Sequence, residues 1–133
     1  MNTSNFLTQL QTQAQGVLFM SESEYPFEPQ NLGVLEAAAI PAAVATHSGT
    51  ANATVKTIAP EQFMAQLERS ADPGDAPIVA NLQKIKNLYA FLNSQLSGLQ
   101  VYRVEAGVQV PIYILGFLPD QTVAGVKTTS IES

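Results

Sequence analysis

A long amphipathic helix followed by three strands is the feature that most constrains how this chain can fold. Apolar residues recur at three- and four-residue steps over about five helical turns. This stripe consists of Ile78, Leu82, Ile85, Leu88, Tyr89, Leu92 and Leu96. We expect Gly98 to end the helix at its C-cap position. Because so long an apolar stripe must be buried against another element, the sequence predicts a helix packed on a sheet.

Three consecutive strands are expected after this helix. Each segment is rich in β-branched and aromatic residues, and turn residues separate one segment from the next. The segments are 101–104, 108–117 and 123–131. Since short connections join antiparallel neighbours, these strands predict a meander. The aromatic residues Tyr102, Tyr113 and Phe117 fall at strand positions, where core or cross-strand packing is the expected role.

Shorter elements are expected before the long helix. Apolar periodicity predicts a helix that ends near Gly16 and a second one from Pro60 to the breaker at 71–75. The alternating, β-branched segment 54–58 predicts a strand between them. At 133 residues the chain is long enough for one hydrophobic core, so we expect a single domain over 1–133.

The region before the predicted strand at 54–58 gives a mixed pattern. Val34–Leu35 would suit a short strand. Ala37–Ala39 favours helix by propensity, although Pro41 limits its length. We expect the small, polar residues 47–53 to form a loop or hairpin tip. With the elements above, this order of helix, strand region, helices and consecutive strands predicts an α+β fold whose largely antiparallel sheet is covered by helices.

Composition excludes several classes of function. The net charge of −5 argues against direct nucleic-acid binding, because such binding needs a basic surface that displaces counterions. The absence of cysteine excludes disulfides and thiolate metal sites. No apolar run approaches the roughly 20 residues of a membrane span, and the N-terminus lacks the basic residues of a signal peptide. We therefore expect a cytoplasmic protein that does not contact a membrane.

The chain offers few groups for catalysis. It contains one histidine, His47, in a predicted loop without an acidic neighbour in sequence, and we expect no functional role for it. Phosphate-binding, nucleophile-elbow and metalloprotease motifs are absent. Glu22 and Glu24 would act as an acid/base pair only if their surroundings separated their pKa values, and nothing in the local sequence suggests this. We expect no enzyme and no cofactor of its own; a hydrolase using these two residues is a distant alternative.

The most acidic segment lies near the N-terminus. Glu22, Glu24 and Glu28 place three carboxylates in seven residues, without a basic residue near them. Ser21 and Glu24 match a helix capping box. Pro26 would then fall inside the helix, where it costs about 3 kcal/mol, so we expect a loop, with a short helical turn as the alternative. Such a loop could be ordinary solvated surface, occupy the place of a phosphate, or supply an oxygen to a metal ion held by another protein.

The segment 17–28 resembles the signature of the nuclease A inhibitor family. These are small acidic bacterial proteins, and the founding member blocks a secreted, sugar-non-specific, metal-dependent endonuclease. Three later segments resemble the family's closing strands: 100–103, 110–116 and 124–128. The resemblance implies an α/β/α sandwich with helices on both faces of the sheet. It also implies a non-enzymatic inhibitor that occupies the nuclease active site.

The resemblance also implies roles for individual residues. Glu22, the first glutamate of the Ser-Glu-Ser-Glu motif, would reach the nuclease's catalytic Mg²⁺, a hard cation that takes oxygen ligands. Glu22 would thus be a ligand only to the partner's metal. Ser133, at the end of the chain, would contribute its carboxylate and hydroxyl. We expect further partner contacts from Ser21, Ser23, Glu24, Glu28, Glu132, Asp72 and Asp75.

One connection departs from the pattern of the family's inhibitor. The inhibitor carries a tryptophan in an acidic connection between two helices, whereas this chain has no tryptophan and offers only Asp72 and Asp75 there. Two functions therefore stay open. One is a monomeric inhibitor of a metal-dependent nuclease, and the other is a protein-interaction module of the same fold with a partner that is not a nuclease.

Overall fold

A five-stranded antiparallel sheet forms the centre of the computed structural model, which describes residues 3–132. In spatial order the strands are β3 (Glu28–Val34), β7 (Thr122–Ile131), β6 (Gln109–Phe117), β5 (Ser97–Glu105) and β4 (Thr54–Ile58). A separate two-stranded hairpin consists of β1 (Leu18–Met20) and β2 (Glu24–Pro26). The predicted meander is confirmed, because β5, β6 and β7 are neighbours both in sequence and in the sheet.

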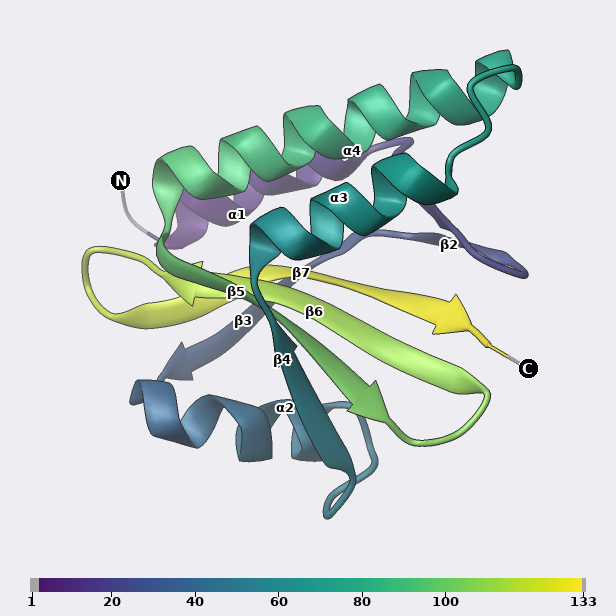
Figure 1. Ribbon diagram of the computed structural model, residues 1–133. Helices are drawn as coiled ribbons and strands as arrows, with labels where there is room; N and C mark the ends of the chain where they lie inside the picture. Colours follow the sequence, from purple (N-terminus) through teal and green to yellow (C-terminus); the bar gives the residue numbers. More distant parts are fainter. Residues whose placement is uncertain (1–2, 133) are drawn as a thin grey trace.

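Helices cover both faces of this sheet (Figure 1). On one face lie α1 (Thr3–Ala14), α3 (Pro60–Ser70) and α4 (Ala76–Gln95). On the other face lies α2 (Ile40–His47), which follows a short 3₁₀ helix, η1 (Ala37–Ala39). The predicted α+β fold, with an antiparallel sheet between helices, is confirmed. Within residues 3–132, none of these helices combines the length and the apolar character that crossing a membrane requires.

Strand β6 shows how the sequence fills both layers of the core. Ile112 and Ile114 face the layer of α1, α3 and α4, while Tyr113 and Leu115 face α2. Each of these four side chains is at most 3% exposed. Because successive side chains of a strand point to opposite faces, a strand covered on both sides is apolar at every position. The expected core role of Tyr102 and Tyr113 is confirmed, since both are buried and lie opposite each other in β5 and β6.

Strand β3 is longer than the sequence predicts. The pattern suggested a short strand at Val34–Leu35, but pairing with β7 begins at Glu28. Pro29 is accommodated because β3 is an edge strand, where a missing N–H donor leaves no partner unpaired. Gly33 has a φ of +78° at a register shift in the β3–β7 pairing, so it forms a β-bulge and does not end the strand.

The helix boundaries around Pro41 also differ from expectation. The alanine run forms only the 3₁₀ turn η1. Pro41 lies in the first turn of α2, where its missing N–H would have no intrahelical acceptor, so the helix continues to His47. The prediction of a loop starting at residue 47 was therefore wrong by one residue. His47 closes α2, and the loop occupies 48–53.

Gly98 does not cap the long helix. The C-cap of α4 is Leu96, and strand β5 already begins at Ser97. Gly98 has a φ of +63° and lies where the β5–β6 register shifts between Ser97 and Gln100. Its conformational freedom therefore serves a bulge at the start of β5. This strand also begins four residues before the predicted segment 101–104.

Candidate partner-binding site

The acidic segment folds as the β1–β2 hairpin, with its turn at residues 21–23. The backbone N–H of Ser21 donates to the carbonyl oxygen of Ser23 at 3.0 Å, and the Ser21 hydroxyl donates to the same oxygen at 3.3 Å. No helical turn forms, so the expectation of a loop is confirmed for these three residues, while Glu24 already belongs to β2. Ser21, Glu22, Ser23 and Glu24 are all exposed. The hairpin therefore presents its two carboxylate-bearing residues at the surface.

Two hydrogen bonds fasten this hairpin to strand β7. The backbone N–H of Ile131 donates to the Ser21 hydroxyl at 2.9 Å, across 110 positions of sequence. The Thr128 hydroxyl donates to the carbonyl oxygen of Tyr25 at 3.4 Å. Figure 1 shows the hairpin and the end of β7 at the same side of the molecule. Glu22 follows Ser21 directly, and Glu132 follows Ile131, so these two predicted site residues belong to one surface. Ser133 lies outside the described residues.

Helix α4 holds the other strand of the hairpin through Asn81. The backbone N–H of Leu18 donates to Asn81 Oδ1 at 3.2 Å, and Asn81 Nδ2 donates to the carbonyl oxygen of Leu18 at 2.7 Å. The Asn81 side chain is only 8% exposed. Sequence reasoning missed this residue. The available signal was a polar residue on the apolar face of the long helix, three positions after Ile78 and four before Ile85.

Replacing Asn81 by leucine is expected to lower the free energy of unfolding by about 2 kcal/mol, because the N–H and carbonyl of Leu18 would lose their partners in a partly buried place. Urea unfolding measures this change. Asn87→Leu is the matched control on the same helix, since Asn87 is exposed and a change of within about 0.5 kcal/mol is expected there. Equal unfolding midpoints for the two variants would contradict the role of Asn81.

The carboxylate of Glu132 forms contacts within the protein itself. Its Oε1 lies 2.7 Å from a guanidinium nitrogen of Arg103, and its Oε2 accepts a hydrogen bond of 2.7 Å from the Ser130 hydroxyl. The hydrogen bond from Arg103 lowers the pKa of Glu132, although partial burial acts in the opposite direction. Arg103 also approaches Glu105 at 3.4 Å. The negative charge of Glu132 is therefore largely compensated, which limits its value for steering a basic partner.

The Arg103–Glu132 contact makes stability depend on pH. Because the pKa of Glu132 is lowered in the folded state, the contact contributes above about pH 4.3, the ordinary glutamate value, and its contribution is lost as the pH falls through the lowered pKa. We expect Glu132→Gln to be less stable than the wild type at neutral pH. This difference should disappear in acid and shrink at high salt. Urea unfolding midpoints of both proteins at several pH values measure it, and a difference independent of pH would contradict the assignment.

Asp72 and Asp75 stabilise the connection between α3 and α4. Asp75 is the N-cap of α4, and its Oδ1 accepts from the backbone N–H of Ile78 at 3.3 Å. Asp72 Oδ1 accepts from the backbone N–H of Gly74 at 2.9 Å. Both carboxylates thus have a structural role that needs no partner. Ala71, which precedes Asp72, and Ser21 of the hairpin turn line one groove between the hairpin, α3 and α4, so this connection lies at the hairpin end of the molecule.

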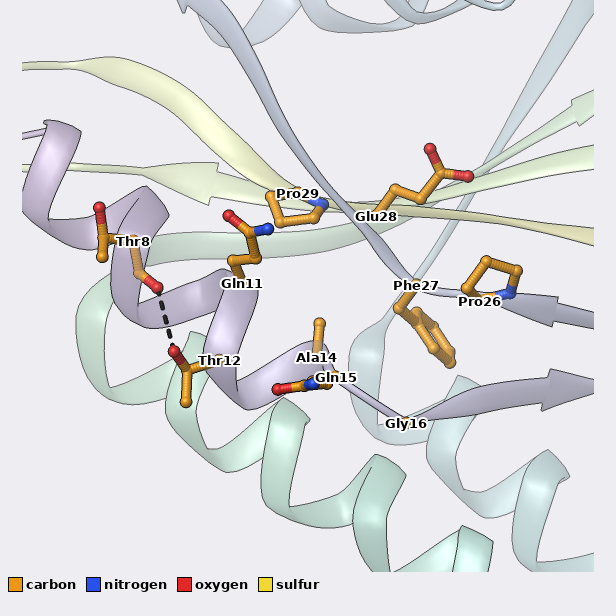
Figure 2. Close-up of a pocket in the computed structure, with 10 residues that line it drawn as sticks. All are labelled: Thr8, Gln11, Thr12, Ala14, Gln15, Gly16, Pro26, Phe27, Glu28 and Pro29. Atoms are coloured by element: carbon orange, nitrogen blue, oxygen red, sulfur yellow. Dashed lines mark hydrogen bonds between the residues drawn. The ribbon is translucent and has the colours of Figure 1, made fainter.

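Glu28 lies in a different environment from the turn. It lines a groove of about 520 Å³ between α1 and the start of β3 (Figure 2). Figure 2 shows Gln11 pointing from α1 towards Pro29, while the carboxylate of Glu28 points away from α1. The Cα partner of Glu28 on β7 is Lys127, which places a cation opposite it in the sheet. Glu28 thus belongs to the groove beside α1 and not to the turn that carries Glu22.

His47 connects α2 to the sheet. Its Nδ1 lies 2.8 Å from the hydroxyl oxygen of Tyr113, and the two rings meet edge to face. Burial raises the pKa of Tyr113 to about 12, so this phenol stays protonated at neutral pH. The contact gives His47 a structural role on the α2 face. Within residues 3–132, no three His, Cys, Asp or Glu residues are grouped so that they could hold a metal ion.

Fold and site together define an α/β/α protein that exposes a carboxylate-bearing hairpin, anchored to its last strand and to its longest helix. The family model described as nuclease A inhibitor-like protein matches residues 4–133, nearly the whole chain. The chain therefore belongs to the nuclease A inhibitor-like family, which confirms the resemblance drawn from segment 17–28. No curated protein matches the chain.

Proposed function

We propose that this protein inhibits a metal-dependent, sugar-non-specific nuclease by placing the hairpin turn in the nuclease active site, with Glu22 at the catalytic metal ion. The observation that carries the proposal is the hydrogen bond between Ser21 and Ile131, which fixes an exposed acidic turn against the last strand. A turn already held in one geometry loses little conformational freedom on binding. Membership of the inhibitor-like family supports a nuclease as the class of partner.

The chemistry of the catalytic metal suits a carboxylate competitor. Mg²⁺ prefers oxygen ligands and usually binds one or two carboxylates together with phosphate oxygens of the substrate. A carboxylate of Glu22 at the place of the scissile phosphate would exclude the substrate and leave the metal no phosphate ester to polarise. The exposed Glu24 would add negative potential that steers the hairpin towards a basic, nucleic-acid-binding cleft.

The other predicted site residues take lesser parts in this proposal. Ser21 and Ser23 shape the turn through their hydrogen bonds. Glu132 brings little free charge because Arg103 binds it. Ser133 would contact the nuclease through its carboxylate and hydroxyl, as the resemblance implies. The protein itself would need no cofactor and carry out no reaction.

A protein-interaction module with a non-nuclease partner is the second candidate. The observation in its favour is that Asp72 and Asp75, which would extend an acidic interface, are both used inside the connection between α3 and α4. Titration of the protein into a purified, magnesium-dependent, sugar-non-specific endonuclease separates the two functions. The inhibitor proposal expects loss of DNA and RNA hydrolysis at one-to-one stoichiometry. Undiminished hydrolysis at a large excess of the protein would favour the module.

A further inference from the structure

A groove of about 260 Å³ lies between the β1–β2 hairpin and helices α3 and α4. Its walls are mainly apolar and come from Met20, Leu67, Ile78, Leu82 and Ile85. Farther along α4, the same apolar stripe is buried, with Leu88 and Leu92 at most 2% exposed. Over its first turns, however, Ile78 and Leu82 are only half-buried. The stripe of the long helix therefore continues beyond the sheet and emerges into this groove.

The groove and the acidic turn form one continuous surface. Ser21 lines the groove and begins the turn that carries Glu22. On the opposite rim, Ala71 lines the groove and precedes the exposed Asp72. Arg69 is an exposed cation beside this rim, while Glu22 and Asp72 place one acid on each side of the groove. The acid Glu68 is already paired with Lys86 at 2.7 Å.

This combination restricts what the groove can accept. Its volume lies below the roughly 300–1,000 Å³ that small-molecule pockets occupy, which suits a single side chain. The apolar walls favour an aliphatic or aromatic group, and the acidic rim favours lysine or arginine around it. A protein that binds nucleic acid offers such a basic surface.

We propose that the groove receives one apolar side chain of the nuclease, presented between basic residues, while Glu22 reaches the metal. This inference rests on the proposed function and adds a second anchor to it. Apolar side chains that enter well-packed, dry pockets are the usual hot spots of protein interfaces. The groove would then supply specificity for one nuclease, whereas a carboxylate at a metal ion would suit any enzyme of the class.

Filling the groove tests this inference. Ser70 is exposed and lines the groove, so Ser70→Trp adds an indole there without removing a buried group. Because the chain has no tryptophan of its own, a blue-shifted emission of this indole would show that it occupies the groove. We expect the inhibition constant for a purified, magnesium-dependent, sugar-non-specific endonuclease to rise about 30-fold or more, as for a lost hot spot. Ser94→Trp, exposed near the other end of α4, is the control and should inhibit like the wild type.

A second variant removes a wall instead of blocking the space. Leu82→Ala should raise the inhibition constant about 10-fold while thermal unfolding shows a folded protein, since the partner side chain would lose apolar contact. If the Ser70→Trp indole does not enter the groove, this variant decides the question. Unchanged inhibition by Leu82→Ala, or by Ser70→Trp with a blue-shifted indole, would overturn the groove proposal. If Glu22→Ala weakens inhibition in the same assays, the proposed function stands without the groove, whereas failure of the wild type to inhibit would overturn both.

Discussion

Replacing Glu22 by alanine is expected to weaken inhibition of a metal-dependent nuclease by about 30-fold to several thousandfold, because loss of one charge from a desolvated interface costs about 2–5 kcal/mol. The variant should still fold, since Glu22 is exposed on the hairpin turn and lies outside the core. Glu22→Gln should lose a similar amount, because it keeps the shape of the side chain but not the charge that attracts a metal ion. Inhibition constants from nuclease assays measure the loss, and urea unfolding checks that the variants stay folded.

The control for Glu22 is a carboxylate far from the hairpin. Glu36 is exposed at the start of η1 and makes no side-chain capping hydrogen bond, so Glu36→Ala removes the same charge without structural effect. We expect it to inhibit like the wild type. Equal losses of inhibition for the Glu22 and Glu36 variants would show that only net charge matters. This result would contradict the proposed contact of Glu22 with the metal ion.

Replacing Gly125 by alanine is expected to destabilise the protein by more than about 4 kcal/mol, an exceptional size for one substitution. Gly125 lies in β7, opposite Leu115 of β6. A Cβ atom there would collide with the carbonyl oxygen of Ile114 and come within 3.1 Å of Leu115 Cα. These are backbone atoms in the middle of the sheet, so two paired strands would have to separate. Since the free energy of unfolding of small domains is only about 5–15 kcal/mol, this substitution would remove a large part of the stability.

Urea unfolding, or the yield of folded protein where the variant is too unstable, measures the effect at Gly125. Gly74→Ala is the control, because Gly74 is exposed and an added Cβ would meet only the flexible side chain of Asp72, at 3.3 Å. We expect it to change stability by less than about 1 kcal/mol. Similar unfolding midpoints for the Gly125 and Gly74 variants would contradict the close approach of β6 and β7.

The parts of the fold that the sequence predicts well are those with a strong period. The stripe of α4 and the alternating segments of β5, β6 and β7 need only local information. The predicted length of strand β3 was too short because proline and glycine, here Pro29 and Gly33, usually interrupt strands. Their tolerance depends on β3 lying at the sheet edge and on a bulge against β7, and such long-range pairing cannot be deduced from neighbouring residues.

In the candidate site, too, the features with a local sequence signal were predictable, and those that depend on long-range contacts were not. Pro26 was enough to reject a helix in the acidic segment, so the exposed turn with Glu22 was predictable. The contacts that hold the turn were not, because Asn81 lies 63 positions from Leu18 and Ser21 lies 110 positions from Ile131. The pairing of Glu132 with Arg103 is equally non-local. Asp75, by contrast, carried a local signal, since aspartate directly before a helix favours the N-cap.

The order of strands in the sheet has a consequence for the order in which the protein folds. The C-terminal meander occupies the middle, while β3 and β4 from the first half of the chain form its two edges. Strand pairs close in sequence form sooner than distant ones, because less loop entropy is lost. We therefore expect β3 and the acidic hairpin to join late, after the meander has been synthesised and has assembled. Nascent or misfolded copies would then lack the surface that we propose for nuclease binding, so that only fully folded molecules would present it.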